Sequence, residues 1–431
     1  MPTPDTLRFG AAVRAAALYA LLAGAAAAAP TVRIEDRAPC SEGHTGYSNC
    51  SFTIRLSQTW AQAVSGVFGA WVDNTDFAEP YVDFEPTPAN PNWSIPAGQT
   101  TTTVTIRVIG DVLDEDNETF YVGLGDLVNA AASGNDLATT VAIADDDAPP
   151  TATLDPCTVV EGSGGTPPLC QTRLRLSGPS GREVSGRFQV APYSALAYSG
   201  FETPAVAGQY QTIPSGQTVD GWSVEGASID LASDALWLTV EGRQSIDLNG
   251  SAPGTLRRDL TLASGVVHEI WFAKAANPDC GAGVKQAQAL LGNQVLGEIL
   301  HEAFAPPNHS DLGWAFERFT VTGSGALRSL RFAGLNAGSC GITLDQIAVL
   351  VRGNAMPNVD VGFAPYEIAI APGTTVSDPI LFDVIPDTEH EPDERFRIVA
   401  ISTSNLGTVT AATGTIVNDD LPIEIFGNSF E

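Results

Sequence analysis

Residues 101–111, with the sequence TTTVTIRVIGD, alternate polar and apolar side chains and end in an acidic loop. Val104, Ile106 and Val108 share one side of an extended chain, because successive side chains of a strand point to opposite faces. The segment therefore predicts a half-buried β-strand that leads into a loop of carboxylates. Residues 119–124 alternate in the same way.

This combination of strands and acidic loops occurs twice in the chain. Each copy has an early Glu-Gly pair, a strand-like run, a turn with Pro and Gly, an aspartate followed by two glutamates, and a closing triplet with at least two aspartates. The first copy contains Glu42-Gly43, residues 52–57, residues 95–98, Asp111, Glu115, Glu118, and Asp145, Asp146 and Asp147. The second contains Glu161-Gly162, residues 172–177, residues 371–373, Asp387, Glu391, Glu394, and Asn418, Asp419 and Asp420. Recurrence at this scale predicts two domains of one kind.

The second copy is interrupted by a long insertion. The interval from Cys170 to Gly373 exceeds the matching interval from Cys50 to Gly98 by about the length of one domain. We expect the insertion to lie between Tyr198 and Gly353, because an exposed loop tolerates an inserted domain whose two ends are close together. Many short β-branched runs predict sandwiches rather than helices. Residues 284–291 fit either an amphipathic helix or a strand with a turn.

The N-terminus predicts export. Arg8 and Arg14 precede an apolar stretch, residues 15–29, that is short for a membrane span, so residues 1–29 are interpreted as a secretory signal peptide, with an uncleaved anchor as the alternative. No later segment is apolar enough to span a membrane. The formal net charge of −29 disfavours nucleic acid and anionic membranes and favours cations.

The cysteines support an extracellular location. The repeat pairs Cys40 with Cys50 and Cys157 with Cys170, because each pair encloses a Glu-Gly loop, and this leaves Cys280 with Cys340. An even count in an exported chain favours disulfides over zinc thiolates.

The acidic loops predict calcium sites. Calcium takes six to eight oxygen ligands, and loops at one end of a sandwich can bring carboxylates together. Asp83, in Tyr81-Val82-Asp83-Phe84, is a further candidate, and Asp360, in Val359-Asp360-Val361, is its counterpart.

At these residues the chain resembles the Calx-β family. The resemblance covers residues 31–148 and, in two pieces, 150–197 and 354–420, and it implies immunoglobulin-like sandwiches with calcium at one tip. The implied ligands in the first copy are Glu42, Asp83, Asp111, Glu115, Glu118, Asp145, Asp146 and Asp147. Those in the second are Glu161, Asp360, Asp387, Glu391, Glu394, Asp419 and Asp420. Gly110 and Pro386 stand where the family often has another aspartate, and Asn418 replaces an acid, so we expect fewer or weaker ions, with the first domain binding better.

The insertion, residues 198–353, resembles the choice-of-anchor C family of galactose-binding-like jelly rolls. The resemblance rests on Gly200-Phe201-Glu202-Thr203-Pro204, Gly221-Trp222-Ser223-Val224, residues 244–250 and residues 340–347. It implies a structural calcium between Glu202 and Asp345, with an ordinary edge carboxylate as the alternative. Four tryptophans could stack on sugar rings or lie in the core: Trp222, Trp237, Trp271 and Trp314.

The sequence as a whole predicts an all-β, non-enzymatic protein. It has no Gly-x-Ser-x-Gly elbow, no His-Glu-x-x-His motif and no phosphate loop. We expect a secreted or cell-surface adhesion protein of a Gram-negative bacterium that binds Ca²⁺ and, through the insertion, extracellular or cell-wall glycans or surface proteins. The alternatives are a carbohydrate-binding module that serves another enzyme and a structural spacer. Residues 421–431 form a tail that resembles short sorting signals.

Overall fold

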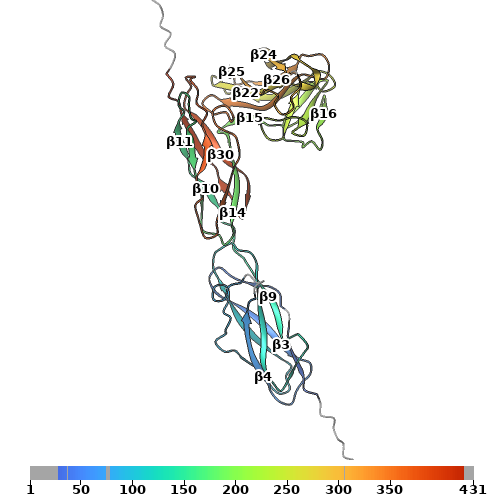
Figure 1. Ribbon diagram of the computed structural model, residues 1–431, viewed down its shortest axis with the longest axis vertical. Coiled ribbons are helices and arrows are strands. Elements are labelled where there is room, and N and C mark those ends of the chain that lie inside the picture. Colours follow the sequence, from blue (N-terminus) through green and yellow to red (C-terminus); the bar gives the residue numbers. More distant parts are fainter. Residues whose placement is uncertain (1–27, 36, 74–77, 305, 422–431) are drawn as a thin grey trace, which may run out of the picture. The chain divides into compact units, whose positions relative to one another are not determined.

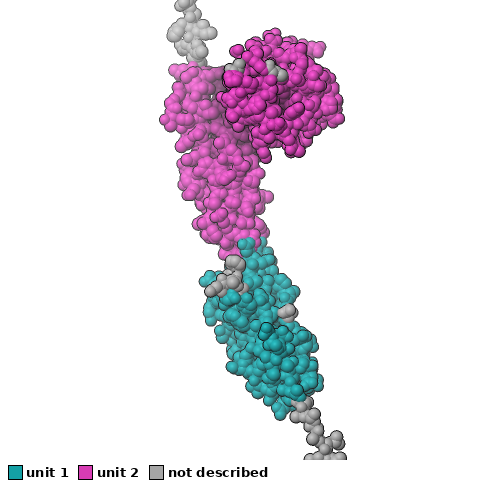
Figure 2. All heavy atoms as spheres, turned by 45° about the vertical axis from the view of Figure 1, so that its right-hand side comes forward, with its two compact units in different colours: residues 1–112, 116–147 teal, residues 113–115, 148–431 magenta. Residues whose placement is uncertain are grey.

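The computed structural model describes residues 28–35, 37–73, 78–304 and 306–421. The described chain is all-β, apart from one short 3-10 turn at Pro278–Cys280. It divides into two compact units (Figure 2). The first comprises the described residues up to Val112 together with Asp116–Asp147, and the second comprises Leu113–Glu115 and the residues from Ala148 onward.

The first unit is a β-sandwich of two sheets (Figure 1). One sheet has the strand order β6 (Thr101–Gly110), β3 (Gly46–Leu56), β1 (Thr31–Ile34) and β8 (Ala131–Ala132). The other has the order β2 (Cys40–Ser41), β9 (Ala138–Ala144), β7 (Glu118–Val128), β4 (Val64–Trp71) and β5 (Asn92–Ile95).

The core of the first sandwich follows the period-two pattern of its strands. Val104, Ile106 and Val108 of β6 are buried, as are Phe120 and Val122 of β7. The two sheets therefore bury one face each against the other, which is the main stabilising contribution in such a fold. The predicted strands at residues 101–109 and 119–124 are confirmed.

The second unit contains another sandwich, built from chain segments on both sides of the insertion (Figure 1). Its larger sheet has the order β11 (Cys157–Val160), β32 (Ala412–Val417), β30 (Glu394–Ser404), β14 (Val184–Pro192) and β28 (Tyr366–Ile370). Facing it are β13 (Leu174–Leu176), β10 (Ala152–Leu154) and β31 (Val409–Thr410), and the pair β12 (Leu169–Thr172) and β29 (Ile380–Asp383).

The two sandwiches share their strand order. The sheet β11-β32-β30-β14-β28 corresponds to β2-β9-β7-β4-β5, and in both sheets the first strand runs parallel to the second. The insertion therefore lies in the connection β14–β28, which corresponds to β4–β5 in the first sandwich. Both connections contain the same local turn, in which Pro80 forms an isolated β-bridge with Phe84 and Pro357 forms one with Val361.

The insertion forms two further sheets in the second unit. One has the order β16 (Tyr210–Pro214), β19 (Ser228–Ser233), β20 (Gln244–Asp247), β27 (Ile342–Val351), β22 (Val267–Ala276) and β25 (Ala315–Thr322), with β15 (Ala195–Ser199) also paired to β27. The other has the order β17 (Thr218–Val219), β18 (Trp222–Gly226), β21 (Gly254–Thr261), β26 (Leu327–Gly334), β23 (Gly283–Leu291) and β24 (Gln294–Ala303). Residues 284–291 thus form a strand, and the helical alternative is wrong.

A β-bulge divides the central strand β27. Ile342 and Leu344 face the core between the two sheets, and beyond the bulge Ile347 and Val349 do so. The pairing with β22 shifts between Trp271 and Ala273, so β27 contains one extra residue at this point. Asp345 lies beside the bulge, is fully buried and accepts a hydrogen bond from the backbone N–H of Val240 in a neighbouring loop.

Two predicted disulfides are confirmed. Cys40 is bonded to Cys50 and Cys157 to Cys170, each with a Cα–Cα distance of 5.7 Å. Cys340 is also disulfide-bonded, but the side chain of Cys280 lies outside the described residues, so that pairing stays a prediction.

Nearly all of the predicted signal peptide, residues 1–29, and nearly all of the predicted tail, residues 421–431, lie outside the described residues. Within the part of the chain that is described, no helix has the length and apolar character needed to cross a membrane.

Candidate metal centres

The first acidic group consists of Glu42, Asp111 and Asp147. Each offers a carboxylate oxygen, and the three oxygens lie within 4.8 Å of one another. The residues follow β2, β6 and β9 in turn, so three strand ends meet at one end of the sandwich. Glu42 is buried, and its Oε1 accepts a hydrogen bond of 3.2 Å from the backbone N–H of Asp111. An all-oxygen donor set from three separate segments suits a hard cation such as calcium.

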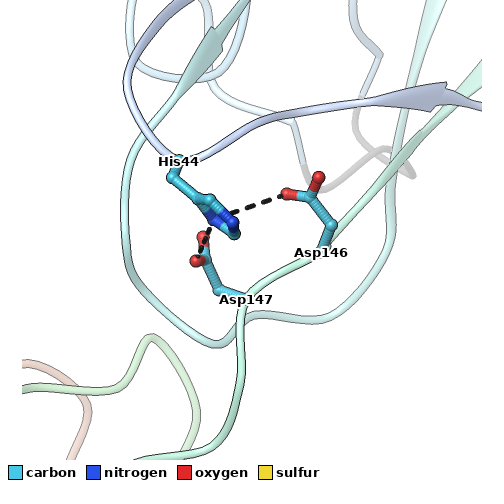
Figure 3. Close-up of side chains that lie close together, drawn as sticks. All are labelled: His44, Asp146 and Asp147. Atoms are coloured by element: carbon cyan, nitrogen blue, oxygen red, sulfur yellow. Dashed lines mark hydrogen bonds and ion pairs between the residues drawn. The ribbon is translucent and has the colours of Figure 1, made fainter.

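Asp146 and His44 adjoin this group (Figure 3). Asp146 accepts hydrogen bonds from Ser41 Oγ at 2.6 Å and from the N–H of Gly43 at 3.1 Å, and the bond from Ser41 is the main cause that lowers its pKa. His44 Nδ1 lies 2.6 Å from Asp147 Oδ1 and 4.0 Å from Asp146 Oδ1. The Glu-Gly loop thus holds two of the three terminal aspartates.

Asp147 shows that the first group suits a cation. Its side chain is only 9% exposed. Among the described residues, its Oδ2 has no hydrogen-bond partner although the atom is buried. Burying a carboxylate oxygen without a donor is unfavourable, and coordination of a cation would remove that cost.

The second sandwich has a matching group, Glu161, Asp387 and Asp420, whose oxygens also lie within 4.8 Å of one another. Asp419 accepts a hydrogen bond of 2.9 Å from the N–H of Gly162, as Asp146 does from Gly43. Burial, and next the charge of Asp387, raise the pKa of Glu161 to about 7.

A serine and an asparagine supply neutral donors at this second site. Ser163 Oγ donates to Asp420 Oδ1 at 2.9 Å, which corresponds to the contact of His44 with Asp147. Asn418, which replaces an acid, donates from Nδ2 to Glu161 Oε2 at 3.2 Å. The neutral amide therefore partly compensates the charge of Glu161 without a cation.

Asp360, Glu391 and Glu394 form another group in the second sandwich. Asp360 and Glu394 are buried, and burial is the largest cause that raises the pKa of each well above its usual range. The charge of Asp360 further raises the pKa of Glu394, whereas a hydrogen bond with Glu394 lowers the pKa of Asp360. Glu391 differs from both, because its Oε1 is paired with Arg318 Nη1 at 2.7 Å.

Several predicted ligands lie outside these groups. Asp83 accepts a hydrogen bond from the N–H of Glu79, in the turn that corresponds to the one in which Asp360 accepts from Met356. Asp145 donates its own N–H to Asn117 Oδ1 at 3.0 Å. Glu118 begins β7, and Glu115 falls in the second compact unit. For Asp83, Glu115, Glu118, Asp145 and Asp419 a role as ligand therefore stays a prediction.

The predicted pair in the insertion, Glu202 and Asp345, is held by backbone donors. Asp345 Oδ2 accepts from the N–H groups of Val240 and Glu241 at 2.8 and 3.0 Å. Glu202 Oε1 accepts from the N–H groups of Arg243 and Gln244 at 2.8 and 3.0 Å. The loop 240–244 thus connects the two carboxylates.

Glu241 and Asp220 complete this acidic region, and neither was predicted from the sequence. Glu241 Oε2 is buried and, among the described residues, lacks a hydrogen-bond partner. Burial, and then the charges of Glu202 and Asp220, raise its pKa to about 7. Each of these two acids precedes a glycine with positive φ, Gly221 at 77° and Gly242 at 62°, as Glu42 and Glu161 also do. An acid before such a glycine is the sequence signal that could have revealed them.

Two of the four predicted sugar contacts are wrong. Trp222 is 0% exposed and Trp237 is 3% exposed, so both are core residues that cannot stack on a sugar. Trp271 and Trp314 are partly buried. Arg318 lies over the ring of Trp271, 4.9 Å from its centroid, and Trp314 donates from Nε1 to the carbonyl of Leu238.

Comparisons with known proteins give distant likenesses. No family model matches the chain. Halomucin from Haloquadratum walsbyi is 24% identical over 160 residues, which span 35% of this chain but only 2% of that protein. The apo-form Calx CBD1 domain is 20% identical, with a TM-score of 0.23, covering 27% of this chain and 99% of that one. The CBM22-1 xylan-binding domain of Xyn10C from Paenibacillus barcinonensis is 18% identical, with a TM-score of 0.22, covering 34% and 97%. Likenesses this distant carry no argument about function, which rests on the sites themselves.

Proposed function

We propose that the chain is an exported, calcium-binding, non-enzymatic adhesion or cell-surface protein. Its two sandwiches bind Ca²⁺ in the loops at one end, and the ion stiffens them by linking separate chain segments. The insertion presents a surface for a glycan or a surface protein.

The observation that carries this proposal is the convergence of Glu42, Asp111 and Asp147 from three strand ends. Mutual repulsion of these carboxylates opposes folding, and a divalent cation would convert the repulsion into attraction. The unpartnered Asp147 Oδ2 supports the same conclusion. Calcium is the hard cation that best matches a site of carboxylates alone.

Thermal unfolding of the mature chain, with excess calcium and with chelator, tests the proposal. Binding to the folded state at a free concentration of 100 times Kd stabilises it by about 2.7 kcal/mol. The variant Glu42→Gln with Asp147→Asn should lose that gain for the first sandwich. Asp126→Asn, an exposed acid at the far end of β7, is the matched control and should keep it. Equal melting with calcium and with chelator in the unmodified chain would refute the proposal.

A pocket in the insertion supports the carbohydrate part of the proposal. It has a volume of about 330 Å³ and is lined by Glu202, Arg243, Asp234 and Gln244 among others. The guanidinium of Arg243 is held by Asp234 through bonds of 2.8 and 3.1 Å. The volume is at the lower end of small-molecule sites, and its polar groups suit sugar hydroxyls.

A glycan array with the intact chain tests this part. We expect retention of at least one glycan, with loss in Arg243→Gln and no loss in Arg397→Gln, an exposed arginine of the second sandwich. If no glycan is retained while calcium still stabilises the chain, the spacer alternative replaces the carbohydrate reading.

A further inference from the structure

Arg318 of the insertion is paired with acids of the sandwich that carries it. It lies on β25, and its Nη1 is 2.7 Å from Glu391 Oε1. Its Nη2 is bonded to Glu389. Both acids belong to the loop that precedes β30. The guanidinium therefore links the insertion to an acidic loop of the second sandwich.

Glu391 is one of the three carboxylates of the group with Asp360 and Glu394. Its side chain is 9% exposed, and that of Arg318 is 20% exposed. The ion pair is therefore largely shielded from solvent, where charge–charge interactions are stronger than at an open surface. Arg318 supplies the positive charge at this group.

The insertion also holds Arg318 in place from its own side. In the register of β22 and β25, Trp271 stands opposite Arg318, and the guanidinium lies over the indole ring. Glu269 Oε1 lies 3.6 Å from Arg318 Nη1 and 3.6 Å from Arg352 Nε. An arginine restrained by an aromatic face and a buried acid is a preorganised donor.

Trp271, which lies under the Arg318 guanidinium, also belongs to an apolar contact. Ala348, Leu350 and Met356 form a small buried cluster, with Trp271 and Phe316 packed against it. The cluster joins strands of the insertion to the segment that returns to the host. Arg318 is thus held next to an apolar contact as well as by charge.

We propose that Arg318 is a built-in cation that competes with calcium for Glu391. This inference rests on the proposed calcium function. Calcium at the group of Asp360, Glu391 and Glu394 would bind the Glu391 carboxylate, and the positive charge of the guanidinium 2.7 Å from Oε1 would repel a divalent ion at the same carboxylate. Calcium at this group therefore weakens the ion pair that links the insertion to the second sandwich.

The neighbouring group of Glu161, Asp387 and Asp420 is different. Glu161 and Asp420 accept hydrogen bonds from the neutral donors Asn418 and Ser163. Calcium would not have to displace a charged side chain from either bond. The second sandwich thus has one group that is open to calcium and one whose cation comes from the inserted fold.

Calcium titration calorimetry of the full mature chain tests this competition. The variant Arg318→Met keeps much of the apolar stem but removes the charge, and its weakest calcium site should bind roughly tenfold tighter or more, or become newly detectable. Adding Glu391→Gln should abolish that site. Arg187→Met, which removes an exposed arginine paired with Glu367 in the same sandwich, should leave the titration unchanged.

A second measurement does not depend on calcium. In chelator, a double-mutant cycle of Arg318→Met and Glu391→Gln, followed by urea unfolding, should show a favourable coupling between the two side chains. No coupling overturns the proposal. Equal calcium titrations of Arg318→Met and the unmodified chain also overturn it.

The pattern of results separates this inference from the proposed function. If calcium stabilises the first sandwich but Arg318→Met changes nothing, only the competition fails. If neither the unmodified chain nor any variant responds to calcium, the calcium function fails and the competition fails with it, while a favourable coupling in chelator would still establish the ion pair.

Discussion

The carbonyl oxygen of Gly43 lies 2.0 Å from the point that a Cβ at Gly110 would occupy. The Glu-Gly loop and the end of β6 are therefore in direct backbone contact. This contact gives the departure at residue 110 a physical reason: no side chain fits there without a shift of the loop that carries Glu42. Close approach of Glu42 to Asp111 depends on that glycine.

Gly110→Ala should destabilise the first sandwich by about 1–3 kcal/mol. The added methyl group would clash with the backbone of Gly43, which cannot shift without moving the loop that carries Glu42. Urea unfolding measures the change. Gly69→Ala is the matched control, since its Cβ would meet only Pro86 O at an ordinary 3.7 Å. Equal effects of the two substitutions would contradict the packing argument.

His44→Ser should retain calcium binding better than His44→Ala. Ser163 makes the corresponding contact with Asp420 in the second sandwich, so a hydroxyl at residue 44 can replace the imidazole as a partner of Asp147. Calcium titration of both variants gives the comparison, and the expected difference is a few-fold because His44 is exposed. Indistinguishable affinities would show that this contact does not orient Asp147.

The stability of the second sandwich in chelator should fall as the pH rises from about 4.5 to about 7. Burial, and next Asp387, raise the pKa of Glu161 from 4.5 to about 7, so over this range the folded state holds a proton that the unfolded state has lost. Stability is therefore greatest below the unfolded pKa and declines through the folded one. Urea unfolding at pH 5 and pH 8 should reveal the decline.

Glu161→Gln should flatten this pH dependence, and calcium should restore stability most strongly at pH 8, where the carboxylates are charged. A pH profile that is the same for Glu161→Gln and the unmodified chain would assign the dependence to other groups.

Glu241→Gln should stabilise the insertion in chelator at pH 8. The substitution removes a buried charge whose Oε2 lacks a partner among the described residues and which Glu202 and Asp220 repel. Thermal unfolding should show a gain of about 1 kcal/mol or more, together with a smaller response to calcium. Glu302→Gln, an exposed acid of β24, is the control and should change neither. A loss of stability in Glu241→Gln would argue against this reading.

The sequence predicted features that depend on short-range pattern. The alternation of Val104, Ile106 and Val108 determines which face of β6 is buried, whatever lies further along the chain. The disulfides of Cys40 and Cys157 follow from short loops. The correspondence of Asp83 to Asp360 was predicted from the Val-Asp pair that both segments contain, and the structure places both residues in the same kind of turn.

Features that depend on long-range contact could not be predicted. The partner of Arg318 lies on the far side of β27 in sequence, and no local pattern joins the two. The burial of Trp222 depends on two sheets that meet only in the folded insertion. His44 was overlooked because a single histidine carries no pattern until Asp146 and Asp147 stand beside it.

The adjacency of the first and last strands of the insertion has a consequence for the order of folding. Ala195 of β15 stands opposite Leu350 of β27, so the folded insertion returns the chain close to where it left. The connection β14–β28, residues 193–365, is about three doublings longer than β4–β5, residues 72–91. Each doubling of a flexible loop costs about 0.6 kcal/mol in closure entropy. The second sandwich avoids that cost if the insertion folds first. We therefore expect β14 and β28 to pair late, after the chain between them is already ordered.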